Sequence, residues 1–304
     1  MRIASLVPAA TETVFALGRG DCLVAVSHEC DFPEEAKRLP VATRARFDSD
    51  QCSPAIDRAV RAYVARGEPL YELDVALLRN LEPETVLVQD GCAVCALPAN
   101  QLAALAVDWQ PAPQIVRLHA HDLAGVFCDI ETVATALGCP EEGQALVGRL
   151  QAELAAVQGR TMRARYRPRV LCLEWLDPPM VAGNWMPALV EAAGGRPLLA
   201  QPGTASAAAS WADIAAAAPE VVVLMPCGFP LERTRAELPC LWKQPEWTSL
   251  PAVKDGRVYA VDGNAYFNRP GPRIVESARI LAGLVQPGLC AHWLPERVWM
   301  RVTE

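Results

Sequence analysis

Two cysteines lie three positions apart in the stretch DGCAVCALP, which directly follows the apolar run LEPETVLVQ. They are Cys92 and Cys95, and a third, Cys30, follows another apolar run with His28 two residues before it. Thiolate and imidazole groups are the ligands that zinc, Cu(I) and iron–sulfur clusters prefer. The sequence therefore contains one candidate metal site, made of His28, Cys30, Cys92 and Cys95.

Two other interpretations of the Cys92 and Cys95 pair stay open. A CxxC pair at the start of a helix is typical of redox sites, because the helix dipole lowers the pKa of the thiol. The pair lies between a predicted strand and the helical stretch ANQLAALA, which fits that geometry. Free cysteines also pack as small apolar residues. Spacing does not choose among these roles, because the chain has no second CxxC pair.

A second set of candidate residues combines aromatic rings with amides, in loops rich in Pro, Gly and Asn such as EWLDPPMVAGNW. Aromatic rings can cover a large planar ligand, and amides can donate hydrogen bonds to its rim. Glu12 has a second interpretation, because the helix dipole favours a carboxylate in the first turn of a helix. The residues expected to contact a ligand are Glu12, Cys30, Cys92, Trp175, Asn184, Trp185, Cys227, Tyr266 and Asn268.

Apolar runs alternate with helical patterns along the chain, which is typical of α/β proteins with mostly parallel sheets. Strands are predicted at residues 2–6, 22–26, 85–89, 114–118 and 169–175. Ligands bind outside the carboxyl ends of the strands in open parallel sheets. The loops that follow the predicted strands carry the candidate residues, so the predicted elements position both sets at sheet edges.

One long helix is predicted near the middle of the chain, because apolar residues recur there every three or four positions, at Leu146, Leu150, Leu154 and Val157. The two halves of the chain also contain similar stretches: LEPETVLVQDGC resembles AAPEVVVLMPCG. We therefore predict an α/β fold with two Rossmann-like lobes, each with a mostly parallel sheet, joined by this helix. The predicted boundaries are an N-terminal lobe at 1–140, a connecting helix at 141–167 and a C-terminal lobe at 168–304.

Composition excludes several classes of protein. The 304 residues are 52% hydrophobic and carry a net charge of −7, without a run of Lys or Arg, so a nucleic-acid partner is not expected. No apolar window reaches the length of about 18 residues that a membrane-spanning helix needs. The GxSxG, GxxxxGK[ST] and HExxH motifs of common enzymes are missing, which favours a protein that is not an enzyme.

The N-terminus MRIASLVPAATE does not have the pattern of a signal peptide. The chain has an odd and high number of cysteines, 11, which favours a reducing compartment over a disulfide framework. We therefore expect a cytoplasmic location, or an extracytoplasmic one if a leader has been removed.

The opening stretch RIASLVPAATETVFALGRGDCLVAVSHECDFP resembles the substrate-binding proteins of cobalamin and iron-chelate importers. The resemblance continues in SWADIAAAAPEVVVL, WTSLPAVKDGRVYAVDGN and RPGPRIVESARIL, so it spans nearly the whole chain. SHECDFP, DGCAVCALP and EWLDPPMVAGNWMP further resemble a subgroup without signal peptides that is commonly labelled cobalamin-binding. The resemblance implies two lobes on a rigid backbone helix, with the ligand in the cleft and little hinge motion.

From this resemblance we expect a cytoplasmic protein that binds a small molecule and is not an enzyme. Its expected ligand is a corrinoid of the cobalamin type or another metal chelate, held in the cleft between the lobes and linked to transport or cofactor handling. Corrinoid cobalt accepts a nitrogen or sulfur ligand, so the thiols and the imidazole suit it. An ABC permease is a doubtful partner for a chain without an export signal. The alternative is a protein that binds zinc or an iron–sulfur cluster through His28, Cys30, Cys92 and Cys95.

Overall fold

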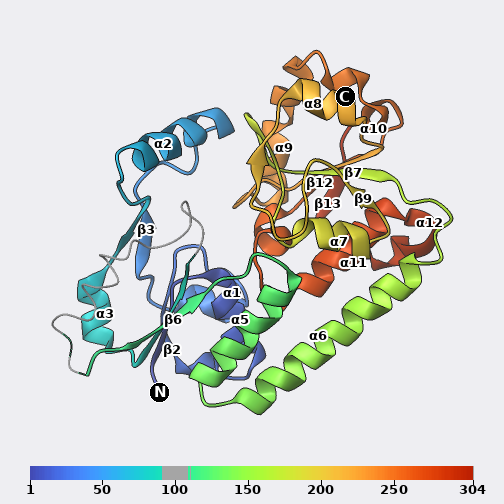
Figure 1. Cartoon of the computed structure of the whole chain (residues 1–304). Coiled ribbons are helices and arrows are strands. Elements are labelled where there is room, and N and C mark those ends of the chain that lie inside the picture. The colour runs from blue at the N-terminus through green and yellow to red at the C-terminus, as the bar shows by residue number, and fades with distance from the viewer. Residues whose placement is uncertain (91–108, 110, 304) are drawn as a thin grey trace. The chain divides into compact units, whose positions relative to one another are not determined.

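The computed structural model describes residues 1–90, 109 and 111–303 (Figure 1). The chain divides into two compact units. Unit 1 comprises Met1–Ala120 and Ala124–Gly148, and unit 2 comprises His121–Leu123 and Arg149–Glu304. Each unit combines helices with a sheet that contains parallel strands. The predicted α/β fold is therefore confirmed.

Unit 1 is built on a four-stranded sheet in the order β2-β1-β5-β6, in which all neighbouring strands are parallel. Its strands form where the sequence has short apolar runs, and Val86, Leu87 and Val88 of the central strand β5 are fully buried. Strands covered on both faces need such continuous apolar runs. The strands are β1 (Ile3–Ser5), β2 (Leu23–Val26), β5 (Thr85–Gln89) and β6 (Gln114–Leu118).

The helices of unit 1 begin and end at residues suited to helix ends. Helix α1 starts with Pro8, which lacks the backbone N–H that the first turn does not need. Asp74 caps α3 by accepting a hydrogen bond from the backbone N–H of Leu77 at 2.8 Å. The helices are α1 (Pro8–Ala16), η1 (Gly20–Cys22), η2 (Glu34–Arg38), α2 (Ser53–Ala65), α3 (Val75–Leu81) and α5 (Leu123–Ala136).

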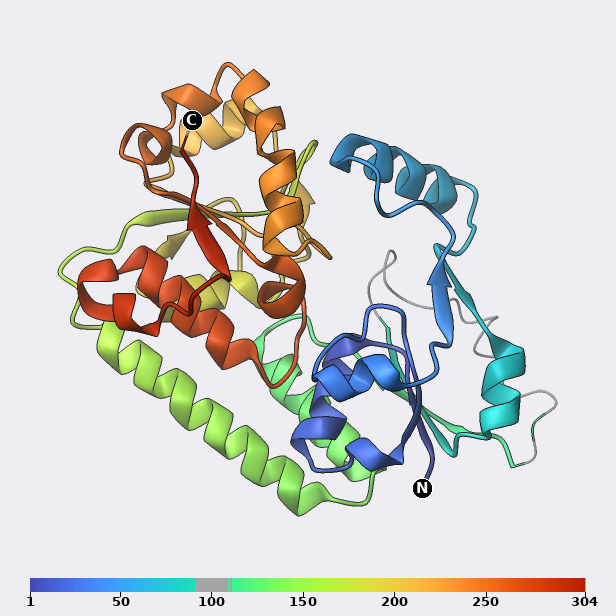
Figure 2. The same ribbon diagram turned by 180° about the vertical axis from the view of Figure 1, so that it is seen from behind.

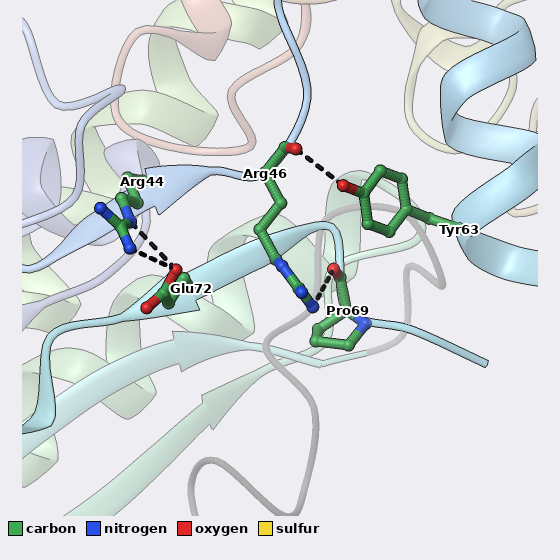
Figure 3. A network of polar contacts seen from close by, with 5 residues as sticks. All are labelled: Arg44, Arg46, Tyr63, Pro69 and Glu72. Atoms are coloured by element: carbon green, nitrogen blue, oxygen red, sulfur yellow. Dashed lines mark hydrogen bonds and ion pairs between the residues drawn. The ribbon is translucent and has the colours of Figure 1, made fainter. Parts of the chain in front are cut away.

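Helix α2 belongs to a separate excursion of unit 1, which starts from the antiparallel pair β3 (Thr43–Ala45) and β4 (Tyr71–Leu73). Polar contacts at its base are shown in Figure 3. Arg44 and Glu72 form an ion pair at 2.7 Å across the two strands, and Tyr63 donates its hydroxyl hydrogen to the carbonyl of Arg46 at 2.8 Å. These contacts join α2 to the strands that carry it.

The sheet of unit 2 has the strand order β10-β8-β7-β11-β12-β13, and β9 also pairs with β7. Its centre, β7-β11-β12, is parallel, whereas β8, β10 and β13 run antiparallel to their neighbours. The strands are β7 (Arg169–Leu176), β8 (Pro179–Val181), β9 (Arg196–Pro197), β10 (Ala207–Ala208), β11 (Val221–Leu224), β12 (Val258–Val261) and β13 (Trp299–Arg301).

A large apolar core supports the sheet of unit 2. Trp247 is fully buried in it, and the rings of Trp211 and Trp242 meet it edge-on, with ring centroids 5.8 and 6.2 Å away. Aromatic pairs favour this arrangement. The helices of unit 2 are α7 (Met186–Ala192), α8 (Trp211–Ala217), α9 (Leu231–Glu237), η3 (Leu238–Lys243), η4 (Trp247–Ser249), α10 (Pro251–Lys254), η5 (Gly263–Phe267), α11 (Ile274–Val285), α12 (Pro287–Cys290) and η6 (Ala291–Trp293).

The long helix predicted from the sequence is α6 (Pro140–Thr161), drawn in green in Figure 1. The chain passes from unit 1 to unit 2 within it, between Gly148 and Arg149. All four apolar positions that predicted the helix are buried. Within residues 1–90, 109 and 111–303, every helix is too short or too polar to cross a membrane.

Candidate functional site

A cluster of small polar side chains closes the carboxyl ends of β1 and β2 in unit 1. The hydroxyl of Thr11 donates to the Ser5 hydroxyl at 2.8 Å and lies 3.1 Å from the thiol of Cys30. The hydroxyl of Ser27 lies 3.3 Å from the same thiol. The cluster forms because α1 starts directly after β1, which turns Thr11 back toward the end of the strand. Cys30 is 5% exposed, so its thiol lies among hydroxyl groups and not at the surface.

Glu12 also lies inside unit 1, with 3% of its surface exposed. The second interpretation placed Glu12 in the first turn of a helix, but α1 begins at Pro8. Glu12 is therefore past the first turn, and the helix-cap interpretation of its carboxylate is wrong.

His28 follows β2 and is an exposed residue with defined partners. Its Nδ1 lies 2.7 Å from the hydroxyl oxygen of Thr43, which also accepts the backbone N–H of His28 at 3.1 Å. The imidazole ring lies beside the ring of Tyr71, with 5.4 Å between centroids. Loss of hydration lowers the pKa of His28 below its ordinary value, and the charge of Glu29 opposes this shift only in part.

These contacts prepare the His28 ring to act as a ligand. A lowered pKa keeps the imidazole neutral at pH 7. The Thr43 hydroxyl can accept a hydrogen from Nδ1 or donate one to it. In the first arrangement the lone pair of Nε2 is available to a metal, and a hydrogen bond on Nδ1 is the usual way in which proteins orient such a ligand.

The predicted site of His28, Cys30, Cys92 and Cys95 falls partly outside the described residues, because Cys92 and Cys95 lie in the stretch 91–108. Of its two described members, Cys30 contacts the hydroxyl cluster and His28 contacts Thr43 and Tyr71. Among the described residues, no group of three or more His, Cys, Asp or Glu side chains could hold a metal ion. The described residues thus give the zinc and iron–sulfur hypothesis no support.

The carboxyl edge of the unit 2 sheet carries aromatic rings. Trp175, near the end of β7, packs against Phe229 from the loop after β11, with 5.2 Å between ring centroids. The guanidinium carbon of Arg233 lies 4.7 Å from the centroid of the Phe229 ring, a cation–π arrangement. The indole N–H of Trp175 is buried and has no hydrogen-bond partner among the described atoms. Trp175 is itself half-buried, so it offers a ligand apolar surface and not its donor.

The other predicted residues of unit 2 divide between interior and surface. Trp185 is buried, and its indole N–H donates to the carbonyl of Phe267 at 3.1 Å. Asn184 is half-buried and has a positive φ of 53°, which asparagine tolerates better than most residues. Tyr266 is half-buried, and the guanidinium carbon of Arg273 lies 5.2 Å from its ring centroid. Asn184 and Tyr266 therefore reach solvent, whereas Trp185 packs inside.

Hydrogen bonds tie the end of β7 to the loops after β11 and β12. Asn268 donates its side-chain N–H groups to the carbonyls of Met225 at 3.1 Å and Gly263 at 2.9 Å. The backbone N–H of Cys227 donates to the carbonyl of Glu174 at 3.0 Å, and Cys227 is exposed. Trp175 near the end of β7, and Cys227 and Asn268 in the loops after β11 and β12, thus belong to one edge of the sheet.

Phe229, Arg233, Thr43 and Tyr71 were missed by sequence reasoning. Phe229 directly follows the stretch AAPEVVVLMPCG and Arg233 comes four residues later, so this pair had a detectable signal. Thr43 and Tyr71 belong to β3 and β4, and nothing in the local sequence connects them to His28.

Residues 3–265 match the family described as periplasmic binding protein. The match covers more than half of the chain, so the chain belongs to this family, which is one of binding proteins. A search of curated proteins found no match.

Solved structures with this fold extend the comparison. The periplasmic haem-binding protein RhuT from Roseiflexus sp. RS-1 is 25% identical, with 95% of this chain and 98% of that chain covered and a TM-score of 0.72. A periplasmic haem-binding protein from Pseudomonas aeruginosa is 21% identical over 95% of this chain and 93% of that one, with a TM-score of 0.72. The periplasmic vitamin B12 binding protein BtuF of Vibrio cholerae is 20% identical over 94% and 96%, with a TM-score of 0.68.

Proposed function

We propose that this protein binds a tetrapyrrole metal chelate, that is, a corrinoid of the cobalamin type or haem. The observation that carries the proposal is the stack of Trp175, Phe229 and Arg233 at the carboxyl edge of the unit 2 sheet. Ligands bind at such edges in parallel sheets, and an aromatic surface suits a flat ligand. The similarity to proteins described as haem-binding and B12-binding supports the same ligand class.

The residues at this edge can each serve one part of such a ligand. Trp175 supplies apolar surface, and burial of apolar area contributes roughly 25 cal/mol per Å2. Arg233 supplies a cation for carboxylate or amide groups on the rim of the ligand, although it also pairs with Glu237 at 3.6 Å. Half-buried Tyr266, which follows β12, supplies a further polar group. Binding therefore combines surface burial with a few polar contacts.

His28 is the described residue best suited to bind the metal of the chelate directly. Its ring is neutral and is oriented by Thr43, and the residue as a whole is exposed. Haem iron commonly accepts a histidine nitrogen. Cys30 is less suited, because hydroxyl groups surround its buried thiol. The predicted contacts of Cys92 and Cys95 stay predictions, since both lie outside the described residues.

A titration followed by absorbance tests the proposal. The purified full chain is titrated with haemin, with cobalamin and with cobinamide. We expect at least one of them to bind at one or two molecules per chain with a Kd of about 1 µM or tighter. Absence of saturable binding by all three would exclude the proposed ligand class.

Two histidine variants test, in the same titration, whether His28 binds the metal of the chelate. His28→Gln removes the proposed ligand nitrogen, so we expect it to weaken binding of the preferred chelate roughly tenfold and to shift its absorbance spectrum. His121→Gln changes an exposed histidine of unit 2 and serves as the control, which should bind like wild type. Identical spectra for wild type and His28→Gln would show that the metal does not bind His28.

The location of the protein in the cell and the partner that receives its ligand are linked predictions. The sequence predicts a cytoplasmic location, whereas delivery to an ABC permease requires an extracytoplasmic one. The family match does not support the doubt about a permease partner. We therefore propose that an ABC permease receives the ligand from this protein. Fractionation of cells that produce the full-length protein separates the two: protein found outside the cytoplasmic membrane agrees with a permease partner, and protein confined to the cytoplasm would replace it with a cytosolic carrier role.

A further inference from the structure

A cavity lies in unit 2, at residues that belong to neither candidate edge. Its volume is about 540 Å3, which is within the range of roughly 300–1,000 Å3 of small-molecule sites. It is lined by residues of β12, α11, α12, β13 and the segment that joins α12 to β13. That segment and β13 are the red end of the chain in Figure 2. None of the candidate residues of the sheet edges lines the cavity.

The register of β12 and β13 determines which side chains form one wall. Side chains alternate between the two faces of a strand. Met300 and Val302 pack in the core of unit 2, so Trp299 and Arg301 point to the other face. Tyr259 of β12 pairs with Arg301 in the sheet and lines the same cavity. This wall therefore combines two aromatic rings and a cation.

The rings of this wall contact each other and the cation. The ring centroids of Tyr259 and Trp299 are 6.0 Å apart, and the guanidinium carbon of Arg301 lies 6.0 Å from the Tyr259 centroid. Among the aliphatic lining residues, Leu294 lies so close to Gly283 that a Cβ there would be 2.7 Å from Leu294 Cδ2. The aliphatic side is thus tightly packed, and the aromatic side carries the polar group.

The rim of the cavity carries a net positive charge. Arg297 and Arg301 are exposed there, against one carboxylate, that of Glu296. Arg297 has a φ of 66°, a backbone conformation that costs free energy in a residue other than glycine and that often marks functional sites. A hydrogen bond of 2.9 Å from the backbone N–H of Asp262 to the carbonyl of Val298 fixes the loop beside it. A cationic rim on a chain with a net charge of −7 favours an anion locally.

We propose that this cavity binds a small aromatic carboxylate. The flat body of the ligand would lie against Tyr259, Trp299 and the aliphatic side, and its carboxylate would pair with Arg301 and Arg297. Arginine pairs well with carboxylates because its N–H groups form a planar fork. This site is separate from the proposed chelate site, so a failed test of one proposal does not affect the other.

Calorimetric titration of the full chain with 2-naphthoate tests the proposal, with the uncharged 2-naphthalenemethanol as the matched ligand. We expect the acid to bind at least tenfold more tightly than the alcohol, because only the acid pairs with the guanidinium groups. Equal affinities, or no saturable binding of the acid up to millimolar concentrations, would overturn the proposal.

Variants of the wall and rim locate the binding. We expect Ala291→Trp, which places a bulky ring at an exposed lining position, to abolish naphthoate binding. Arg301→Gln and Arg297→Gln should each weaken it about tenfold. Arg163→Gln, at an exposed arginine that does not line the cavity, is the control and should leave it unchanged.

Trp175→Ala distinguishes this cavity from the proposed chelate site. We expect it to leave naphthoate binding unchanged, because Trp175 does not line the cavity. Loss of naphthoate binding in Trp175→Ala together with normal binding in Ala291→Trp would show that naphthoate occupies the other site and would overturn the proposal. Melting curves of all variants check that each one is folded.

Discussion

The carboxyl edges of the two sheets are built from different kinds of residue. In unit 1, Ser5, Thr11, Ser27 and Cys30 fill the ends of β1 and β2 with short polar side chains that bond to one another. In unit 2, Trp175 and its aromatic neighbours stand at the ends of β7 and β11. The polar groups of the first edge bond to one another, whereas the second edge presents a flat apolar surface.

This difference separates two sources of binding energy. An aromatic edge gains affinity from area removed from water, which has little directional preference. A neutral, oriented imidazole such as that of His28 gains affinity only from a partner at one position, for example a metal. We therefore expect the affinity of the unit 2 edge for a flat ligand to depend on the area buried, and any binding at His28 of unit 1 to depend on the identity of the metal.

The largest expected effect concerns how closely the unit 2 edge is packed. A Cβ at Gly263 would overlap the carbonyl oxygen of Pro226 and lie 2.7 Å from the carbonyl carbon of Met225, both of them backbone atoms. We expect Gly263→Ala to lower the free energy of unfolding by about 3 kcal/mol. Gly148→Ala is the control: it meets no atom within 4 Å inside helix α6 and should raise that free energy by about 0.5–1 kcal/mol.

Denaturant unfolding followed by circular dichroism measures both glycine variants. A Gly263→Ala protein as stable as wild type would mean that the loops after β11 and β12 are not held against each other, and the contrast between the two edges would be lost.

The next effect concerns the hydroxyl cluster of unit 1. Thr11→Val keeps the shape of the side chain but removes the hydroxyl that joins Ser5 to Cys30. We expect the free energy of unfolding to fall by about 1–2 kcal/mol, because buried polar groups lose a partner. Thr135→Val is the control, since the Thr135 hydroxyl donates to the carbonyl of Glu131 in an exposed turn of α5. Equal losses in the two variants would argue against a cooperative cluster.

A smaller effect is expected at Cys30 itself. Cys30→Ala removes a weak hydrogen-bonding group and little volume, so we expect a loss of about 1 kcal/mol in the free energy of unfolding. Zinc and iron content, measured by mass spectrometry on protein purified without oxygen, should not depend on this residue. If wild type contained stoichiometric metal and Cys30→Ala did not, the result would support the zinc or iron–sulfur alternative.

The smallest effect is a pH dependence at His28. Partial loss of hydration, where the ring packs against Tyr71 and Thr43, lowers the pKa of His28 in the folded chain below the ordinary value of about 6.5. The unfolded chain therefore takes up this proton at a higher pH than the folded chain, so stability falls as the pH drops below the ordinary value. We expect wild type to lose more stability than His28→Gln between pH 7.5 and pH 5.5. Parallel losses in the two proteins would contradict the lowered pKa.

The sequence predicted the elements that depend on burial alone. The strands of the unit 1 sheet and β7 came from apolar runs, and α6 came from the spacing of Leu146 and its neighbours, because hydrophobic periodicity reflects which face is covered. The excursion β3-α2-β4 was not predicted. Its strands, TRA and YEL, are three residues long and only partly buried, so no apolar run marks them.

The candidate site was predictable only at the level of loops. The loops that follow the strands can be located from the apolar runs, but the direction of each side chain depends on partners far along the chain. Trp185 turns inward because its indole N–H meets the carbonyl of Phe267, 82 residues later. Cys30 turns inward because Thr11 and Ser27 surround it. Residue types and their spacing do not indicate such distant partners.

The most direct test of the central claim is a calorimetric titration of Trp175→Ala beside Trp293→Ala, with the chelate that wild type binds most tightly. Both variants remove an indole from unit 2, but only Trp175 belongs to the aromatic edge of the sheet. We predict that Trp175→Ala weakens binding roughly tenfold or more, because a large aromatic surface is lost, and that Trp293→Ala binds like wild type. Unchanged affinity in Trp175→Ala would contradict the account.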